Sequence, residues 1–289
     1  MTLKTLALGL ILLATTAVCW AGSFTGPSGA LFLTDSTNST IYVVQGNSVV
    51  ASFPEAYAGS FSESVIAVTA GNGIATRTYY TGDSSGGGQY TLGGTPTGVL
   101  YGDPLPAGVT SDFAWDGTSN GVNNFFVEDF GVTGTGSHTE TVYATGLDWS
   151  NPVALFSVQT IPGTSVGEYR GISYDPLNNS LWLGGWDDEI IADYSLSGTL
   201  LSSFVPQSFE NGALAFDPSD GTIWVAAGGS NLLDQYSTTG TLLQSGTPIG
   251  LPAGTILGGE FIEATPEPAT WTAMFSGLVA LAGLRRKPR

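Results

Sequence analysis

The stretch GISYDPLNNSLWLGGWDDEIIADYSLSGTLLSSF, residues 171–204, is followed 42 positions later by a second version of the same pattern, ALAFDPSDGTIWVAAGGSNLLDQYSTTGTLLQS, residues 213–245. Nine aligned positions between 175 and 201 are identical, more than composition alone would supply. They are Asp175-Pro176, Trp182, Tyr194-Ser195 and Gly198-Thr199-Leu200-Leu201, which recur as Asp217-Pro218, Trp224, Tyr236-Ser237 and Gly240-Thr241-Leu242-Leu243. A period in the forties, made of short apolar runs divided by turn residues, is typical of one β-propeller blade.

Each copy divides into four apolar segments separated by turn residues. Ser197-Gly198 and Thr239-Gly240 are two-residue turns with glycine second, which predicts a hairpin at the same place in both copies. A four-stranded meander alone leaves its edges and one face open, and radial stacking buries them. We therefore expect Trp182 and Trp224 to pack between blades; an aromatic platform for a sugar is the alternative.

Weaker versions of the unit precede the repeated pair. Including that pair, the predicted units lie near residues 30–53, 65–105, 112–158, 170–205 and 212–246. The run ILGGEFI, residues 256–262, has no unit of its own and is expected to return and complete the first blade, which would close the ring. The sequence predicts an all-β domain over residues 22–263, a propeller of about five four-stranded blades. Six blades is an alternative, because the early units match poorly.

Charge is distributed very unevenly along the chain. Five of the seven basic residues lie in the terminal segments, and only Arg77 and Arg170 lie in the body. All but one of the 24 acidic residues lie between Asp35 and Glu263, so the body carries a net charge of −21. Such a surface repels polyanions and cannot neutralise phosphates, so we expect no nucleic-acid partner.

The first 21 residues have the features of a secretory signal peptide. Lys4 is followed by an apolar run over residues 6–18 and by small residues before a cleavage position after Ala21. Cys19, the one cysteine, would lie in the removed segment, and a lipoprotein is the alternative to simple cleavage. We expect an exported body without thiols or disulfides.

The last residues carry three ordered elements. Pro266-Glu267-Pro268 comes first, a short apolar run follows, and the basic cluster Arg285, Arg286, Lys287 and Arg289 comes last. In residues 264–289 the chain resembles the PEP-CTERM sorting tail of exported bacterial proteins. The resemblance implies recognition by an exosortase-type processing enzyme and removal of the tail near Pro266-Glu267-Pro268. It also implies release or surface attachment, often in bacteria that make exopolysaccharide.

The physical character of this tail agrees with the resemblance. Residues 269–284 are about long enough for a marginal membrane-spanning helix. The basic cluster after them would keep that end cytoplasmic and leave the body outside. We therefore expect transient inner-membrane anchoring through this hydrophobic helix before processing. The body is then expected at the cell surface, in the outer membrane or outside the cell; an ordinary C-terminal anchor is the alternative.

Candidate catalytic and metal-binding residues are few. His138 is the only histidine and lies in a glycine-rich insert, a poor place to hold a catalytic base, so we expect no Ser-His-Asp triad and no zinc site. Asp187, Asp188 and Glu189 form the densest acidic cluster, at a predicted turn. Oxygen ligands of this kind suit Ca²⁺, the one cofactor we consider, although acidic turns are usually only solvated.

An aspartate near the end of each predicted opening strand recurs as Asp35, Asp116, Asp175 and Asp217. These four carboxylates could form a ring at the mouth of the axis. Alternatively, each could accept backbone N–H bonds within its own turn, which the following Pro or Gly favours.

Three functions are compatible with these features. The first is an exported, non-catalytic cell-surface or extracellular-matrix protein whose propeller binds polysaccharide or surface proteins, or has a structural role. The second is a calcium-dependent propeller enzyme of the lactonase or lyase type, which would require carboxylates from three or more blades at one mouth of the axis. The third is carbohydrate binding through Trp115, Trp149 or Trp186, exposed on one face. Fold alone does not choose among them.

Overall fold

The computed structural model describes residues 24–80, 86–102, 113–128, 140–158, 168–186, 189–207, 211–227 and 230–262. The predicted signal peptide with Ala21, the sorting tail with Pro266-Glu267-Pro268 and its basic cluster, His138, Asp187 and Asp188 lie outside these ranges. Within the described part of the chain, no helix is long and apolar enough to cross a membrane.

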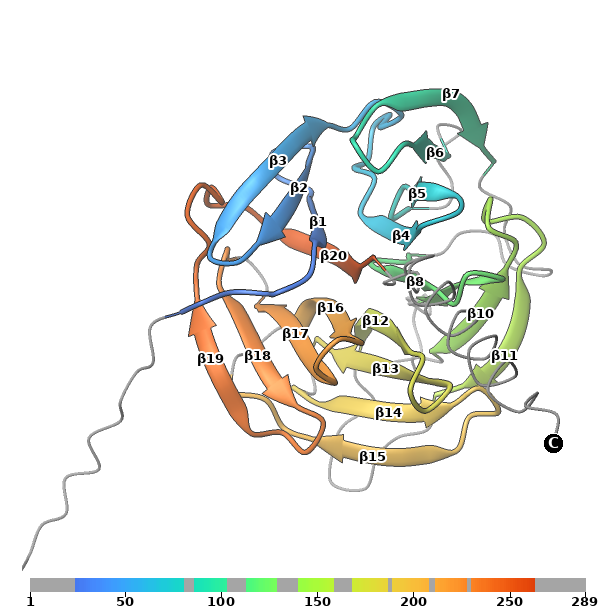
Figure 1. Cartoon of the computed structure of the whole chain (residues 1–289). Coiled ribbons are helices and arrows are strands. Elements are labelled where there is room, and N and C mark those ends of the chain that lie inside the picture. Colours follow the sequence, from blue (N-terminus) through green and yellow to red (C-terminus); the bar gives the residue numbers. More distant parts are fainter. Residues whose placement is uncertain are drawn as a thin grey trace, which may run out of the picture.

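The described strands form five antiparallel sheets of four strands each, arranged around a central axis (Figure 1). From the axis outward, blade 1 contains β20 (Ile256–Phe261), β1 (Leu31–Asp35), β2 (Thr40–Gln45) and β3 (Ser48–Pro54). Blade 2 contains β4 (Val65–Thr69), β5 (Gly73–Arg77), β6 (Gly87–Tyr90) and β7 (Pro96–Tyr101). Blade 3 contains β8 (Gly117–Ser119), β9 (Asn124–Glu128), β10 (Thr141–Thr145) and β11 (Val153–Ser157).

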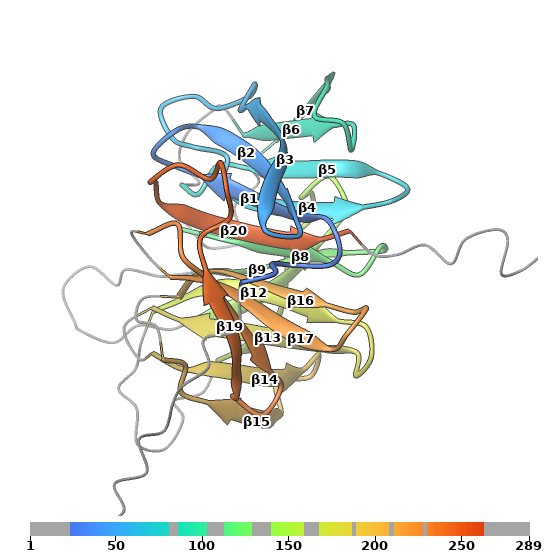
Figure 2. The same cartoon turned by 60° about the vertical axis from the view of Figure 1, so that its left-hand side comes forward.

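The repeated stretch of the sequence forms the last two blades. Blade 4 contains β12 (Tyr169–Asp175), β13 (Ser180–Gly185), β14 (Ile191–Ser195) and β15 (Leu200–Phe204). Blade 5 contains β16 (Asn211–Asp217), β17 (Thr222–Ala227), β18 (Leu233–Ser237) and β19 (Leu242–Gly246). Figure 2 shows β12 to β15 in succession from the middle of the molecule to its surface. The prediction of an all-β propeller with five four-stranded blades is therefore confirmed, and the alternative of six blades is wrong.

The ring is closed by the two ends of the body. The run predicted to return to the first blade is β20, and it pairs antiparallel with β1 from Leu31↔Phe261 onward. Because β20 takes the innermost place, β1 is the second strand of blade 1 and not its opening strand. The sequence alignment of Asp35 with Asp175 was therefore shifted by one strand: Asp35 ends a second strand, whereas Asp175 ends an innermost one.

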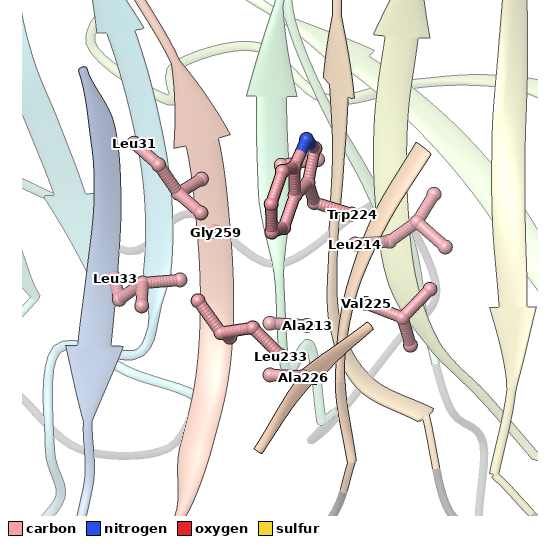
Figure 3. A pocket seen from close by; sticks show the side chains of 10 residues that line it. Leu31, Leu33, Ala213, Leu214, Trp224, Val225, Ala226, Leu233 and Gly259 are labelled. Carbon is pink, nitrogen blue, oxygen red and sulfur yellow. The ribbon is translucent and has the colours of Figure 1, made fainter. Parts of the chain in front are cut away.

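The apolar core is divided into five clusters, one at each interface between neighbouring blades. Trp182 of blade 4 packs with Leu214 and Phe216 of blade 5, and Trp224 of blade 5 packs with Leu31 of blade 1. Both indoles are 1% exposed, which confirms the predicted packing between blades. Figure 3 shows the interface of blades 5 and 1, where the space among these side chains admits no water molecule. Each blade face is thus buried against its neighbour, as radial stacking requires.

The start of the described chain packs against blade 5. It runs across this blade before entering β1 (Figure 1). The Gln244 side chain accepts hydrogen bonds from the main-chain N–H of Thr25 at 2.8 Å and of Gly26 at 3.2 Å. Phe24 meets Trp224 edge-on, with ring centroids 6.2 Å apart. The blade 5 to blade 1 junction is therefore held by this segment as well as by β20.

Candidate functional site at the propeller axis and its mouth

The centre of the ring is occupied by the carboxylate of Asp116, which lies just before β8 and is fully buried. An innermost strand presents unpaired backbone N–H groups toward the axis, and buried N–H groups need acceptors. The Asp116 carboxylate accepts hydrogen bonds from backbone N–H groups of four blades. Its Oδ1 accepts from Gly117 N at 2.8 Å and Gly259 N at 3.0 Å, and its Oδ2 accepts from Leu214 N at 3.0 Å and Ile172 N at 3.2 Å.

A second layer of polar contacts lies next along the axis. Glu260 of β20 accepts hydrogen bonds from Val68 N of blade 2 at 2.7 Å and from Ser119 N and Thr118 Oγ1 of blade 3 at 2.8 and 2.6 Å. Two hydroxyl oxygens extend the layer, since Thr118 Oγ1 accepts from Tyr174 N and Ser173 Oγ accepts from Phe216 N. Asp116 and Glu260 together contact the innermost strands of all five blades, so the axis is filled by structural polar contacts.

The buried environment of Asp116 changes the pKa of its carboxyl group. Burial raises the pKa of the Asp116 carboxyl well above its ordinary value, and the four N–H donors oppose that rise because they favour the ionised form. Each oxygen already accepts two hydrogen bonds, so a proton on Asp116 would have to displace one of them.

The other three aspartates of the predicted ring serve their own turns. Asp35 accepts from Thr37 N, Asp175 from Leu177 N and Asp217 from Ser219 N, at 3.0, 2.8 and 2.9 Å. The turn interpretation is confirmed for these three. The ring at one mouth is wrong: Asp35 belongs to a second strand, and Asp116 lies on the axis itself.

One mouth of the axis, at the starting ends of the innermost strands, holds a pocket of about 360 Å³. This volume is within the range of small-molecule sites, about 300–1,000 Å³. Four blades contribute its described lining: Ser36, Thr255 and Leu257 of blade 1, Tyr79 of blade 2, Trp115 of blade 3, and Arg170 and Trp186 of blade 4. Among these described lining residues there is no carboxylate.

The aromatic rings of the mouth hold an arginine between them. The guanidinium carbon of Arg170 lies 4.3 Å from the ring centroid of Trp115 and 3.7 Å from that of Trp186. Cation–π contacts of this kind are strengthened when water is excluded. Tyr79 stacks on Trp115, with centroids 4.8 Å apart and planes 13° from parallel. The Arg170 Nε donates to Glu168, and the side chains of this pair are 16% and 17% exposed.

The three tryptophans predicted to be exposed on one face differ in their positions. Trp115 and Trp186 are half-buried and line the same pocket, whereas Trp149 is 1% exposed and packs between blades 2 and 3. The inclusion of Trp149 among exposed aromatics was therefore wrong. The role of Arg170 was missed, although it is one of only two basic residues in the body.

The predicted calcium ligands are only partly described. Glu189 is half-buried with a positive φ of 52°, at the start of the segment leading into β14, and its two acidic neighbours lie outside the described residues. Among the residues that the structure describes, no group of three or more His, Cys, Asp or Glu side chains is placed to hold a metal ion.

A separate acidic cluster joins blades 1 and 2. The Glu63 carboxylate is fully buried and accepts from the hydroxyl of Thr76 and from the Tyr90 hydroxyl, the latter at 2.9 Å. Glu55 accepts from Glu63 N at 2.9 Å. Burial, together with the nearby Glu63 charge, raises the pKa of Glu55 to about 7. Both glutamates lie on the segment between β3 and β4, so these contacts hold the crossover from blade 1 to blade 2.

No protein-family model matches the chain, and no curated protein matches it. Among solved structures, a chain of a nidogen–laminin complex is similar over 80% of this chain and 97% of that chain, with a TM-score of 0.50 and 12% identity. A protein of unknown function from Bacteroides caccae is similar over 76% of this chain and 73% of its own, with a TM-score of 0.47 and 14% identity. The nidogen–laminin likeness shows the β-propeller fold alone.

Proposed function

We propose that this protein is an exported, non-catalytic cell-surface or matrix component whose propeller is a binding module, with the pocket at the mouth of the axis as its site. One observation carries the proposal: four blades place aromatic and hydroxyl side chains and a fixed arginine around one concavity. Concave, largely preformed pockets with few polar groups are where small molecules and chain ends of polymers bind.

The state of the axis supports binding rather than catalysis. A general acid or base must reach its substrate within hydrogen-bond distance. Asp116 has no exposure, and all four of its acceptor positions are engaged by backbone N–H groups. Glu260 is 5% exposed and is held in the same manner. A calcium-dependent lactonase or lyase would need several carboxylates open at one mouth. The described lining of the mouth pocket contains none, and that of the opposite mouth contains one, the hydrogen-bonded Glu260.

Sorting through the tail completes the proposal. The resemblance of residues 264–289 to PEP-CTERM tails supports recognition by an exosortase-type enzyme, with Pro266-Glu267-Pro268 as the processing motif and residues 269–284 as the transient anchor. The body would then reach the cell surface, the outer membrane or the medium.

The test is expression of the full chain in a host with an exosortase and in the same host without it. We expect a body shortened by the tail and accessible to external protease only in the first host. Substitution of Pro266-Glu267-Pro268 by three alanines should leave the unprocessed chain in the inner membrane, whereas three alanines at the exposed residues 200–202 of β15 should not. Unchanged processing in all strains would contradict the sorting role. Calcium-dependent turnover of lactones or polysaccharides by the exported body would instead favour the enzyme.

A further inference from the structure

We propose that the mouth pocket binds a neutral pyranose unit of a polysaccharide, with Trp115, Trp186 and Tyr79 providing aromatic contact and Arg170 providing hydrogen-bond donors. This inference rests on the proposed binding function and names its ligand class. It follows from three properties of the pocket: its aromatic lining, the Arg170 donors that no described acceptor contacts, and its charge.

Aromatic side chains dominate the pocket. Tyr79, Trp115 and Trp186 come from three different blades. Trp115 is contacted by Arg170 and stacked by Tyr79 and Phe113, with ring centroids 4.8 and 5.6 Å away, so it offers its edge to a ligand. The face of Trp186 that is turned away from Arg170 is the stacking surface. The face of an aromatic ring carries negative partial charge and favours weakly positive C–H groups. A pyranose presents such C–H groups on its ring face, and it presents hydroxyls around its rim. A wholly apolar ligand would leave the Arg170 Nη groups without an acceptor among the described residues.

Arg170 supplies the polar side of the site. Its Nε donates to Glu168, and among the described residues no acceptor contacts its two Nη groups. The guanidinium fork is fixed between two tryptophans, so its remaining donors are preorganised at the pocket. The Ser36 hydroxyl donates to the Thr255 carbonyl oxygen at 3.3 Å, and the Thr255 hydroxyl accepts from Thr37 Oγ1 at 3.0 Å. Ser36 Oγ therefore keeps acceptor capacity, and Thr255 Oγ1 keeps a proton to donate. The ligand must therefore offer several oxygen acceptors, as sugar hydroxyls do.

Charge selects a neutral sugar over an acidic one. The Arg170 charge is already balanced by Glu168, and the body as a whole carries −21. A uronate polymer would be repelled by this field and would find no uncompensated cation in the described pocket lining. A neutral glycan is not repelled. A cationic ligand is disfavoured, because the guanidinium already occupies the cation–π position between the two rings.

The test measures glycan binding to the exported protein by calorimetry. The probes are neutral cello-, malto- and galacto-oligosaccharides and, in parallel, oligogalacturonate. We expect one or more neutral series to bind, with affinity almost independent of salt, because no charge pairing is involved. Binding only to oligogalacturonate, weakened by salt, or binding to no probe in the presence of a correctly delivered body, would overturn this inference and leave the proposed export and sorting intact.

Variants locate the site. Trp186→Ala is expected to weaken binding about tenfold or more, as loss of one stacking surface does elsewhere, and Arg170→Lys should weaken it too because the fork is lost. Tyr174→Ala, which removes an aromatic ring at the opposite mouth, is the matched control and should bind as the parent. Thermal melting shows that each variant is folded, and Trp186→Phe replaces Trp186→Ala if the latter is not. Binding by folded Trp186 and Arg170 variants equal to that of the control would overturn the proposal.

Discussion

Replacement of Asp116 by asparagine tests the filled axis most sharply. The substitution keeps the shape of the side chain but leaves one acceptor oxygen in place of two. Two of the four N–H groups from Gly117, Gly259, Leu214 and Ile172 would then face an NH₂ donor. A hydrogen bond to a charged group contributes about 1.5–3 kcal/mol, so two lost bonds cost about 3–6 kcal/mol. Relief from burying a charge offsets part of this, and we expect a net loss of about 2–4 kcal/mol.

Urea and thermal unfolding of the purified protein measure this effect. For a body of this size, 1 kcal/mol shifts Tm by about 2–4 °C, so Asp116→Asn should lower Tm by about 5–15 °C. The matched control is Asp217→Asn, because Asp217 holds its turn through Oδ1 and its Oδ2 has no hydrogen-bond partner among the described residues. The control should change stability by under ~1 kcal/mol. Equal, small losses in both variants would refute the view that Asp116 joins four blades.

Three further predictions concern other contacts. The pKa of Glu55 is about 7 in the folded protein, so between pH 4.5 and 7 the folded state holds a proton that the unfolded chain releases. The protonated Glu55 therefore stabilises the fold fully below the ordinary pKa of 4.5, and this stabilisation is lost as the pH rises toward 7. Allowing for solvent screening, this amounts to about 1–2 kcal/mol, so Glu55→Gln should flatten part of the fall in Tm between pH 4.5 and 7, and an unchanged slope would count against it. Gly258→Ala would place a Cβ about 2.0 Å from the carbonyl oxygen of Ser64, so we expect urea unfolding to show a loss of stability of about 3 kcal/mol. Gly71→Ala has open space around it and should leave stability nearly unchanged. Similar losses of stability in both variants would be inconsistent with a crowded axis. Gln244→Ala removes the acceptor for the N–H groups of Thr25 and Gly26. We expect stability to fall by about 1–2 kcal/mol and the segment at the start of the described chain to be cleaved faster by protease. Unchanged proteolysis would show that other contacts hold this segment.

Much of the architecture could be predicted because it is written in local patterns. The 42-residue period defined blades 4 and 5, and the unmatched run at residues 256–262 indicated ring closure. Trp182 and Trp224 repeat at one position, which is what an inter-blade contact requires. Asp35 was wrongly predicted to end an opening strand, because the innermost strand of blade 1 comes from the other end of the body. The local sequence pattern around Asp35 therefore resembles that of an opening strand, although β1 is the second strand of its blade.

The axis and the mouth could not be predicted in this way. Asp116-Gly117 has the composition of an ordinary turn, and only the meeting of four innermost strands turns it into a shared acceptor. The lining of the mouth combines residues from four blades at no regular spacing. One signal was available: Arg170 is one of only two basic residues in a strongly acidic body, and such an exception indicates a specific role.

The measurement that tests the binding module most directly is a titration of the ¹⁵N-labelled protein with a neutral oligosaccharide, followed through the indole N–H signals. The tryptophans lie in distinct environments, since Trp115 and Trp186 line the mouth and Trp149, Trp182 and Trp224 are buried between blades. We predict that the signals of Trp115 and Trp186 shift saturably while the three buried signals stay in place. Shifts confined to the buried indoles, or no shift with any neutral glycan, would contradict the assignment of the mouth as the binding site.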